Sequence, residues 1–230
     1  MLHKEIDQAL RKSPLFTGIS DQELLYLLNC LKPKTYTYKR GDYIVVEGNS
    51  FDSIGILRYG EATVSREDAS GNRVIISTLK PGSMFGEIFV FSGQTLWLST
   101  IQAQKDSAVI FLQRDKIVGE CGNVCPWHKK LIWNLLKIIS DEALVLNKKV
   151  EYLTIKSIRG KIATFLIDQC SDFGGYTFVL PMKRKELAEF LNVSRPSLSR
   201  EMSRMRDEGI IDFHMSAIKI IDIERLKKHL

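Results

Sequence analysis

Residues 192–211, NVSRPSLSREMSRMRDEGII, combine serines, a proline and four arginines with an apolar ending. Asn192 tolerates the left-handed backbone conformation that a tight turn requires, and the Ser194 side chain is suited to capping a helix. Pro196 then falls in the first helical turn, where no backbone hydrogen bond is lost. The stretch therefore predicts a short turn followed by a helix.

The two faces of this helix differ in character. Leu198, Met202 and Met205 are spaced four and three residues apart, so they share one inward face. The residues left on the outward face are basic or carry hydroxyl groups: Arg195, Ser197, Ser199, Arg200 and Arg204.

A second helix is predicted just upstream, within KRKELAEFL at 183–191, with its own apolar inner face. Two helices joined by a three-residue turn form a helix-turn-helix, whose second helix enters the DNA major groove by its N-terminal end. Residues 213–221, FHMSAIKII, add a short hairpin that serves as the wing. The region is predicted to be a winged helix-turn-helix.

The chemistry of this region suits DNA. Residues 183–206 hold seven Lys or Arg against three Glu. Arginine matches the paired acceptors of guanine, and serine hydroxyls contact phosphates or base edges. Lys183 and Arg184, at the start of the first helix, are expected to contact phosphate. The alternative is a solvated basic face on an ordinary helical hairpin.

The residues before the long helix fall into a helical N-terminal region and a β-rich region. From Tyr36 to about residue 113, short β-rich segments alternate with Gly, Asp and Asn, which is typical of an antiparallel sandwich or barrel. Residues 68–73, DASGNR, are predicted to be a hairpin turn. Residues 1–31 are predicted to be helical, with a capping box at Ser20 and Glu23.

A long helix is predicted to follow Pro126. Its apolar residues recur at alternating spacings of four and three: Ile132, Leu136, Ile139, Ala143, Leu146, Val150 and Leu153. This repeat favours a left-handed coiled-coil seam with a second copy of the chain over a helix lying on its own core. We therefore expect a homodimer.

Composition sets the broad class. The 230 residues are enough for two modest domains, and the formal net charge of +6 permits a polyanionic partner. No run of eighteen apolar residues occurs, and the N-terminal MLHKEIDQAL has no apolar core of a signal peptide. We expect a cytoplasmic protein without a membrane partner.

Four cysteines are present: Cys30, Cys121, Cys125 and Cys170. Cys121 and Cys125 form a C-x3-C pair, and His128 follows three residues later. No second ligand pair of the usual zinc spacing follows, so ordinary thiols are favoured over a metal or redox site.

Along essentially its whole length the chain resembles the Crp/Fnr superfamily of bacterial transcription regulators. SPLFTGISDQELLYLL (13–28) resembles the N-terminal helix of that family, and LKPGSMFGEI (79–88) resembles part of its cyclic-nucleotide-binding-type β-roll. SIRGKIATFLI (157–167) resembles the start of its DNA-binding domain, and residues 193–211 resemble its recognition helix.

The resemblance implies an α+β fold with an N-terminal antiparallel β-roll of the jelly-roll type, a long dimerisation helix and a C-terminal winged helix-turn-helix. The expected parts are an effector-sensing roll at 1–125, a dimerisation helix and hinge at 126–156, and a DNA-binding domain at 157–230. The implied partners are double-stranded DNA with two-fold-related half-sites, a second copy of the chain, and RNA polymerase.

The effector site departs from the family pattern. In cAMP-binding members a Gly-Glu pair contacts the ribose, and Gly86 and Glu87 match it. An Arg-Ser pair then holds the cyclic phosphate, but Trp97 and Leu98 stand there in this chain. A buried phosphate without its cation is costly, which argues against cAMP.

The long helix departs in the same way, because Leu146 and Asn147 stand where hydroxyl residues contact adenine. Trp97, Leu98 and Leu146 instead suggest an apolar pocket, suited to an apolar or aromatic effector or filled by its own side chains. The effector itself is not identified by the sequence.

Other cofactors and activities are also disfavoured. Iron–sulfur members of the family carry a cluster of cysteines near the N-terminus, but here only Cys30 lies in the first hundred residues. Haem requires axial ligands, and of the four histidines only His128 lies near the effector domain. Neither cofactor is therefore expected. No Gly-rich phosphate loop, GxSxG or HExxH motif of an enzyme is present. We expect a regulator rather than an enzyme; the alternative is a cyclic-nucleotide-type regulatory module with a non-DNA output.

Overall fold

The computed structural model describes residues 7–67, 70, 73–119 and 125–230. The chain divides into two compact units, 1–141 and 142–230. Within the described residues, none of the helices is long and apolar enough to pass through a lipid bilayer.

The first unit begins with helices rather than with one continuous helix. They are α1 (Gln8–Lys12), the 3-10 turn η1 (Pro14–Phe16) and α2 (Asp21–Leu31). The helical character expected of residues 1–31 is confirmed from Gln8 to Leu31, but it is divided between separate helices because Ser13 takes an extended conformation and Pro14 starts a new turn. The capping box is confirmed: the Glu23 carboxylate accepts from the Ser20 N–H at 2.7 Å.

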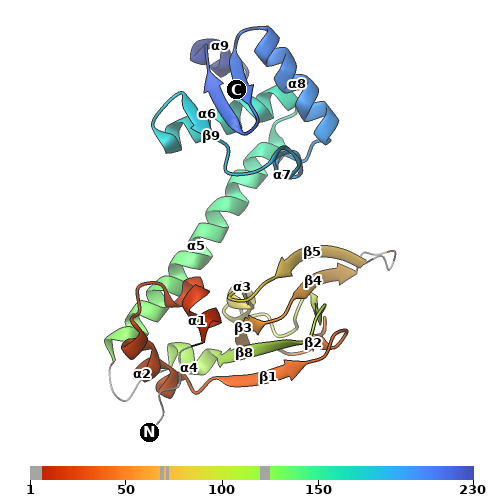
Figure 1. Cartoon of the computed structure of the whole chain (residues 1–230). Helices are drawn as coiled ribbons and strands as arrows, with labels where there is room; N and C mark the ends of the chain where they lie inside the picture. The colour runs from red at the N-terminus through yellow and green to blue at the C-terminus, as the bar shows by residue number, and fades with distance from the viewer. Residues whose placement is uncertain (1–6, 68–69, 71–72, 120–124) are drawn as a thin grey trace. The chain divides into compact units, whose positions relative to one another are not determined.

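Two four-stranded antiparallel sheets follow, in the orders β1-β8-β3-β6 and β2-β7-β4-β5 (Figure 1). Their strands are β1 (Lys34–Tyr38), β2 (Tyr43–Val45), β3 (Ser53–Tyr59), β4 (Ala62–Glu67), β5 (Arg73–Leu79), β6 (Met84–Phe85), β7 (Thr100–Ala103) and β8 (Ser107–Gln113). Two short helices, α3 (Glu87–Val90) and α4 (Arg114–Val118), interrupt and follow them. The antiparallel roll is confirmed, while most of the expected turn at 68–73 lies outside the described residues.

Alternation along β8 separates two apolar cores. Val109 and Phe111 face the space between the sheets, whereas Ile110 and Leu112 face the helices on the other side. The core between the sheets is rich in aromatic rings, and the other is aliphatic.

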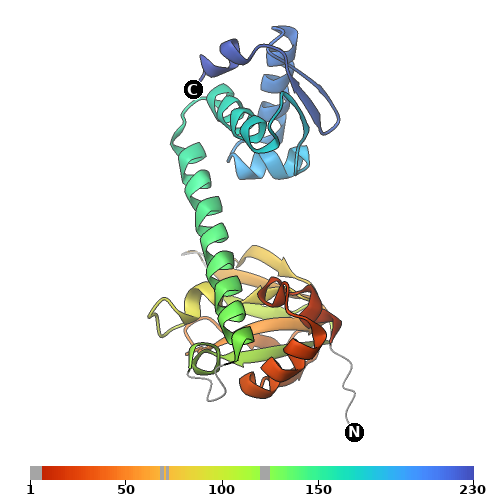
Figure 2. The ribbon, with the colours of Figure 1, turned by 90° about the vertical axis from the view of Figure 1, so that its left-hand side faces the viewer.

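The long helix α5 (Pro126–Thr154) packs its first turns against the aliphatic core through Leu131 and Leu135, both buried. The Asn134 amide donates to the carbonyls of Leu15 and Thr17 at 3.0 and 2.9 Å. Figure 2 shows the N-terminal helices beside this part of α5. The start of the long helix is therefore an integral part of the roll unit.

The second unit is the winged helix-turn-helix that the sequence predicts, on a three-stranded sheet ordered β10-β11-β9. Its elements are α6 (Ile158–Phe173), β9 (Thr177–Val179), α7 (Arg184–Phe190), α8 (Arg195–Asp207), β10 (Ile211–His214), β11 (Ala217–Ile220) and α9 (Ile223–Lys227). The Ser157 hydroxyl caps α6 by accepting from the Gly160 N–H at 2.8 Å.

The last turns of α5 are anchored in this second unit. Tyr152 is buried between Phe165 and Phe190, with ring centroids 6.1 and 5.4 Å away. Its hydroxyl donates to the Asp168 carboxylate at 2.7 Å, and Lys148 pairs with the same carboxylate at 2.5 Å. Burial, together with the nearby carboxylate, raises the pKa of Tyr152, so its phenol stays protonated.

Candidate DNA interface and effector pocket

The turn between α7 and α8 has the conformation that the sequence predicts. Asn192 has φ of 51°, in the left-handed region. The Ser194 hydroxyl accepts from the Ser197 N–H at 3.2 Å and caps α8, and Pro196 lies in the first turn. The start of α8 is therefore fixed by local chemistry.

The two faces of α8 are also confirmed. Leu198, Met202 and Met205 are fully buried in the core of the second unit. On the other side, the predicted contact residues are exposed except for Ser197, which is half-buried: Arg195, Ser197, Ser199, Arg200 and Arg204.

The outward residues are held only loosely by the protein. Arg200 Nη2 donates to the Ser197 hydroxyl at a long 3.4 Å, and Arg204 meets the Glu201 carboxylate at 3.4 Å. Long, exposed contacts of this kind contribute little to stability. The donors of Arg200 can therefore turn to a ligand at small cost to the fold.

A carboxylate–guanidinium network holds α8 against α6. Arg159 donates to Glu201 at 2.6 Å and makes a two-pronged contact with Glu208 at 2.7 and 2.8 Å. This bond to Arg159 lowers the pKa of the Glu208 carboxyl. The network fixes the orientation of the recognition helix, and the sequence pattern alone did not reveal it.

A buried lysine supports the turn. Lys161, on α6, donates from Nζ to the Leu191 carbonyl at 2.9 Å, and its side chain is almost fully enclosed. Leu191 ends α7, where a carbonyl has no partner within the helix. Lys161 satisfies this carbonyl and so ties the two helices of the motif to α6.

The two residues expected to contact phosphate, Lys183 and Arg184, differ in their exposure to solvent. Lys183 is exposed at the start of α7. The Arg184 guanidinium instead contacts the Met202 sulfur and stacks on the Phe213 ring, 4.6 Å from its centroid. Burial lowers the pKa of Arg184. A phosphate contact by Arg184 requires its side chain to leave this packing.

Most of the predicted seam residues on α5 are open to solvent. Leu136, Leu146, Val150 and Leu153 are 53%, 63%, 52% and 45% exposed, and Ala143 is also exposed. Ile132 and Ile139 are half-buried, and Ile139 packs against the aliphatic core of the roll. An apolar stripe of this length on a charged helix is unusual for a surface that stays in water.

The six predicted effector residues are divided between the two units. Gly86, Glu87 and Trp97 are in the roll, where Glu87 and Trp97 are buried, but Leu98 is 50% exposed. Leu146 and Asn147 lie on α5 within the second unit, and both are exposed. A shared effector site for all six stays a prediction.

Trp97 fills space inside the roll. Its ring meets Phe51 and Phe89 edge-to-face, with centroids 4.9 and 5.0 Å apart. Gly86 approaches the same cluster closely: a Cβ there would lie 2.8 Å from the Ser53 carbonyl oxygen, at φ of +94°. The part of the roll that bears the family motif is therefore tightly packed with aromatic side chains.

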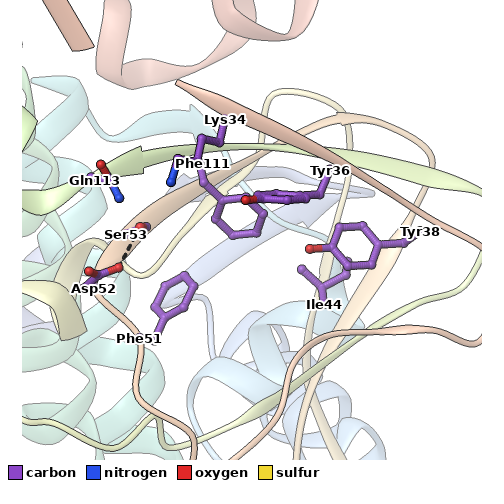
Figure 3. A pocket seen from close by; sticks show the side chains of 9 residues that line it. All are labelled: Lys34, Tyr36, Tyr38, Ile44, Phe51, Asp52, Ser53, Phe111 and Gln113. Atoms are coloured by element: carbon purple, nitrogen blue, oxygen red, sulfur yellow. Dashed lines mark hydrogen bonds between the residues drawn. The ribbon is translucent and has the colours of Figure 1, made fainter. Parts of the chain in front are cut away.

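An open pocket of about 300 Å³ lies in the roll beside this cluster, and Phe51 belongs to both (Figure 3). Figure 3 shows the rings of Tyr36, Tyr38, Phe51 and Phe111 around it. Its full lining is Lys34, Tyr36, Tyr38, Ile44, Phe51, Asp52, Ser53, Phe111 and Gln113. Burial raises the pKa of the Tyr38 phenol, which keeps it a neutral donor. No local sequence pattern reveals this pocket, because its lining comes from four separate segments.

Comparisons with known proteins agree with this arrangement. Residues 36–121 match the cyclic nucleotide-binding domain family, and residues 160–229 match the Crp-like helix-turn-helix domain. The CRP-like cAMP-activated global transcriptional regulator of Mycobacterium tuberculosis is 21% identical over 228 residues, covering 97% of this chain and 99% of that protein.

Two further similarities extend across most of the chain. The transcriptional activator protein FnrA of Stutzerimonas stutzeri is 24% identical over 191 residues, covering 80% of this chain and 75% of that protein. The crystal structure of the Thermus thermophilus catabolite activator protein covers 94% of this chain and 98% of its own, at 19% identity and a TM-score of 0.54.

Fold and site together define a DNA-binding regulator with an antiparallel β-roll, a long helix and a winged helix-turn-helix. Both family matches fall in the order and place expected of that class. The chain belongs to the Crp/Fnr superfamily of transcription regulators. Its relatives are transcription regulators, in keeping with the expected non-enzymatic function.

Proposed function

We propose that this protein is a sequence-specific DNA-binding transcription regulator that acts as a homodimer and responds to an effector other than cAMP. The observation that carries the proposal is the outward face of α8. It presents Arg195, Ser199 and Arg200 at the N-terminal end of a helix whose other face is fully buried. Such a face has the donors and the shape to enter a major groove.

Arg200 is the residue to which we assign base reading. It lies one and a half turns into α8, on the outward side with Ser197, and is free to reorient. Its two-pronged guanidinium matches guanine O6 and N7. Lys183 is assigned a phosphate contact, since it is exposed at the start of α7. Pro196 has no side-chain acceptor for cytosine, so the preferred half-site differs there from that of relatives with Glu.

Homodimerisation is supported by the exposed stripe on α5. A two-fold pair of chains presents two copies of α8, which fits DNA with two-fold-related half-sites. We assign residues 126–156 to the dimerisation helix and hinge, with the effector-sensing and DNA-binding domains at 1–125 and 157–230. RNA polymerase is the expected further partner.

The experiment is selection of bound sequences from randomised DNA, followed by competition binding, with the wild type and Arg200→Ala. Loss of the contact is expected to cost about 1–3 kcal/mol in each half-site and to relax the preference at one base pair. The matched control is Arg114→Ala, which removes one exposed arginine from α4 in the roll unit. If Arg200→Ala selects the same motif as the wild type with equal stringency, α8 does not read the bases as proposed.

Effector binding is assigned to the roll, and the pocket in Figure 3 has a size and an aromatic lining that suit a small aromatic compound. Aromatic rings supply stacking surfaces, while Lys34 and Asp52 supply one charge of each sign at its rim. Mass spectrometry of small molecules that co-purify with the wild type identifies the compound.

A filled-pocket variant, Tyr36→Trp, is expected to lose that compound. The matched control is Tyr43→Trp on β2, where the tyrosine is 58% exposed and does not line the pocket. Retention of the compound by Tyr36→Trp places the effector elsewhere.

A further inference from the structure

Cys30, Cys125 and His128 meet at one point in the first unit. Their ligand atoms, two Sγ and one imidazole nitrogen, all lie within 4.8 Å of one another. Cys30 comes from the last turn of α2, Cys125 immediately precedes α5, and His128 lies in its first turn. The cluster is thus made by segments 95 positions apart, a proximity that no local spacing in the sequence reveals.

The tautomer of His128 follows from its two neighbours. Nε2 lies 3.0 Å from the Lys116 carbonyl oxygen, which can only accept, so Nε2 carries the proton. In the neutral ring this leaves the lone pair on Nδ1, which lies 3.2 Å from Cys125 Sγ. A metal-bound histidine is held in this way, with one nitrogen toward the metal and the other donating to a carbonyl.

The Lys116 carbonyl oxygen is an available acceptor for the His128 N–H. It belongs to α4, whose last carbonyls have no partners within so short a helix. The histidine is itself buried, with only 8% of its surface exposed. Its ring therefore cannot swing away without leaving both contacts.

The dimensions suit a tetrahedral ion. Zn–S bonds of about 2.3 Å and Zn–N bonds of about 2.0 Å place ligand atoms roughly 3.5–3.8 Å apart. Cys125 Sγ and His128 Nδ1, 3.2 Å apart, reach that spacing by separating slightly, and the more distant atoms, all within 4.8 Å, reach it by closing about 1 Å. Both changes are within ordinary side-chain adjustment. Two sulfurs and an imidazole are soft and borderline ligands that select zinc over magnesium or calcium.

We propose that Cys30, Cys125 and His128 supply three of the ligands of a zinc site. The site joins the end of α2 to the start of α5, and α4 supplies the support for the histidine. Cys121 lies outside the described residues.

The site has a mechanical consequence for the roll unit. Leu27 and Leu31 of α2 and Leu131 of α5 belong to the same aliphatic core that the cluster borders. A bound ion adds a covalent-strength link between helices that otherwise meet through apolar packing. Zinc is therefore expected to stabilise the attachment of α5 to the roll, independently of whether the protein binds DNA.

The test uses the full chain, prepared metal-free under reducing conditions, with Co²⁺ as the spectroscopic probe. About one equivalent of Co²⁺ per chain is expected, with thiolate-to-cobalt charge-transfer bands and the strong visible bands of tetrahedral cobalt, and Zn²⁺ displaces it. Cys30→Ser, Cys125→Ser and His128→Asn are each expected to weaken binding by at least about tenfold, since even outer-shell changes cost roughly 10–100-fold.

The matched control is Cys170→Ser, which removes a thiol from α6 in the other unit and is expected to bind Co²⁺ as the wild type does. Thermal melting separates ligand loss from misfolding: Zn²⁺ is expected to raise the melting temperature of the wild type and to raise that of Cys30→Ser by less at the same Zn²⁺ concentration. The proposal is overturned if the reduced wild type binds no Co²⁺, or if Cys30→Ser binds Co²⁺ as tightly as the wild type and with thiolate bands of the same intensity. It is equally overturned if Cys30 and Cys125 are found only as a disulfide in a chain that takes no metal.

Discussion

If the exposed apolar stripe on α5 is the seam of a dimer, a pair of variants on that helix can test it. Leu146 and Leu144 are each 63% exposed on the same helix, two positions apart. At 3.6 residues per turn they lie about 200° apart around the axis, so only Leu146 belongs to the proposed seam. Leu146→Asp is expected to give monomers, while Leu144→Asp remains dimeric.

The expected size of the effect follows from burial. Enclosing the exposed part of one leucine is worth about 1–2 kcal/mol, so two copies contribute about 2–4 kcal/mol to the dimer. Each aspartate carried into the seam adds a desolvation cost of several kcal/mol. The sum exceeds about 5 kcal/mol, a weakening of the dimer by more than about 10³-fold.

In the separate chain both changes are equivalent, because each replaces an equally exposed leucine by an aspartate with a helix propensity lower by about half a kcal/mol. Leu146 is a better probe than Ile139, which also packs on the roll's own core. Sedimentation equilibrium over a range of concentrations measures the association constants. An unaltered dimer for Leu146→Asp, or equal dissociation of Leu144→Asp, would refute the seam.

Three other outcomes are expected. Isothermal calorimetry should detect no cAMP binding at micromolar concentrations, because Trp97 occupies the position of the phosphate-binding arginine; specific binding would contradict this. Lys161→Met should lower the free energy of unfolding of the second unit by about 1–3 kcal/mol in urea, since the Leu191 carbonyl loses its buried donor; an unchanged midpoint would show that this bond adds nothing. Because Arg159 lowers the pKa of the Glu208 carboxyl, the stability from this pair is present at neutral pH and is lost as the pH falls through that lowered pKa. Glu208→Gln should therefore melt at a lower temperature than the wild type at neutral pH but alongside it in strongly acidic buffer; a constant difference would exclude this linkage.

Local chemistry explains which features the sequence could predict. Asn192, Ser194 and Met202 act within one turn or one helix, where spacing and side-chain type determine conformation. The helical character of residues 1–31 was predictable for α2, whose capping box and apolar face are local, whereas the break at Ser13 and Pro14 divides the helices before it. The seam and the contact residues on α8 were likewise visible from their periodicity, although their roles stay predictions.

Features made by distant segments were not predictable in this way. Lys161 looks like an ordinary lysine until α6 is packed against the end of α7. The sequence position of Arg184 suggests a phosphate contact, but in the folded chain its guanidinium stacks on Phe213 of β10. Cys30 and His128 are far apart in sequence and meet only when α2 and α5 share a core. Each of these depends on tertiary packing, for which a single sequence has no periodic signal.

The pairing of β1 with β8 has a consequence for synthesis on the ribosome. Lys34 pairs with Phe111, 77 positions later, and β8 lies between β1 and β3 in its sheet. At translation rates of about 5–20 residues per second, β1 waits roughly 4–15 s before its partner is made. A nascent chain that stops before Ser107 therefore cannot complete this sheet. In contrast, the β10–β11 hairpin joins neighbouring segments and can pair as soon as it is made, so we expect the roll to fold more slowly than the second unit.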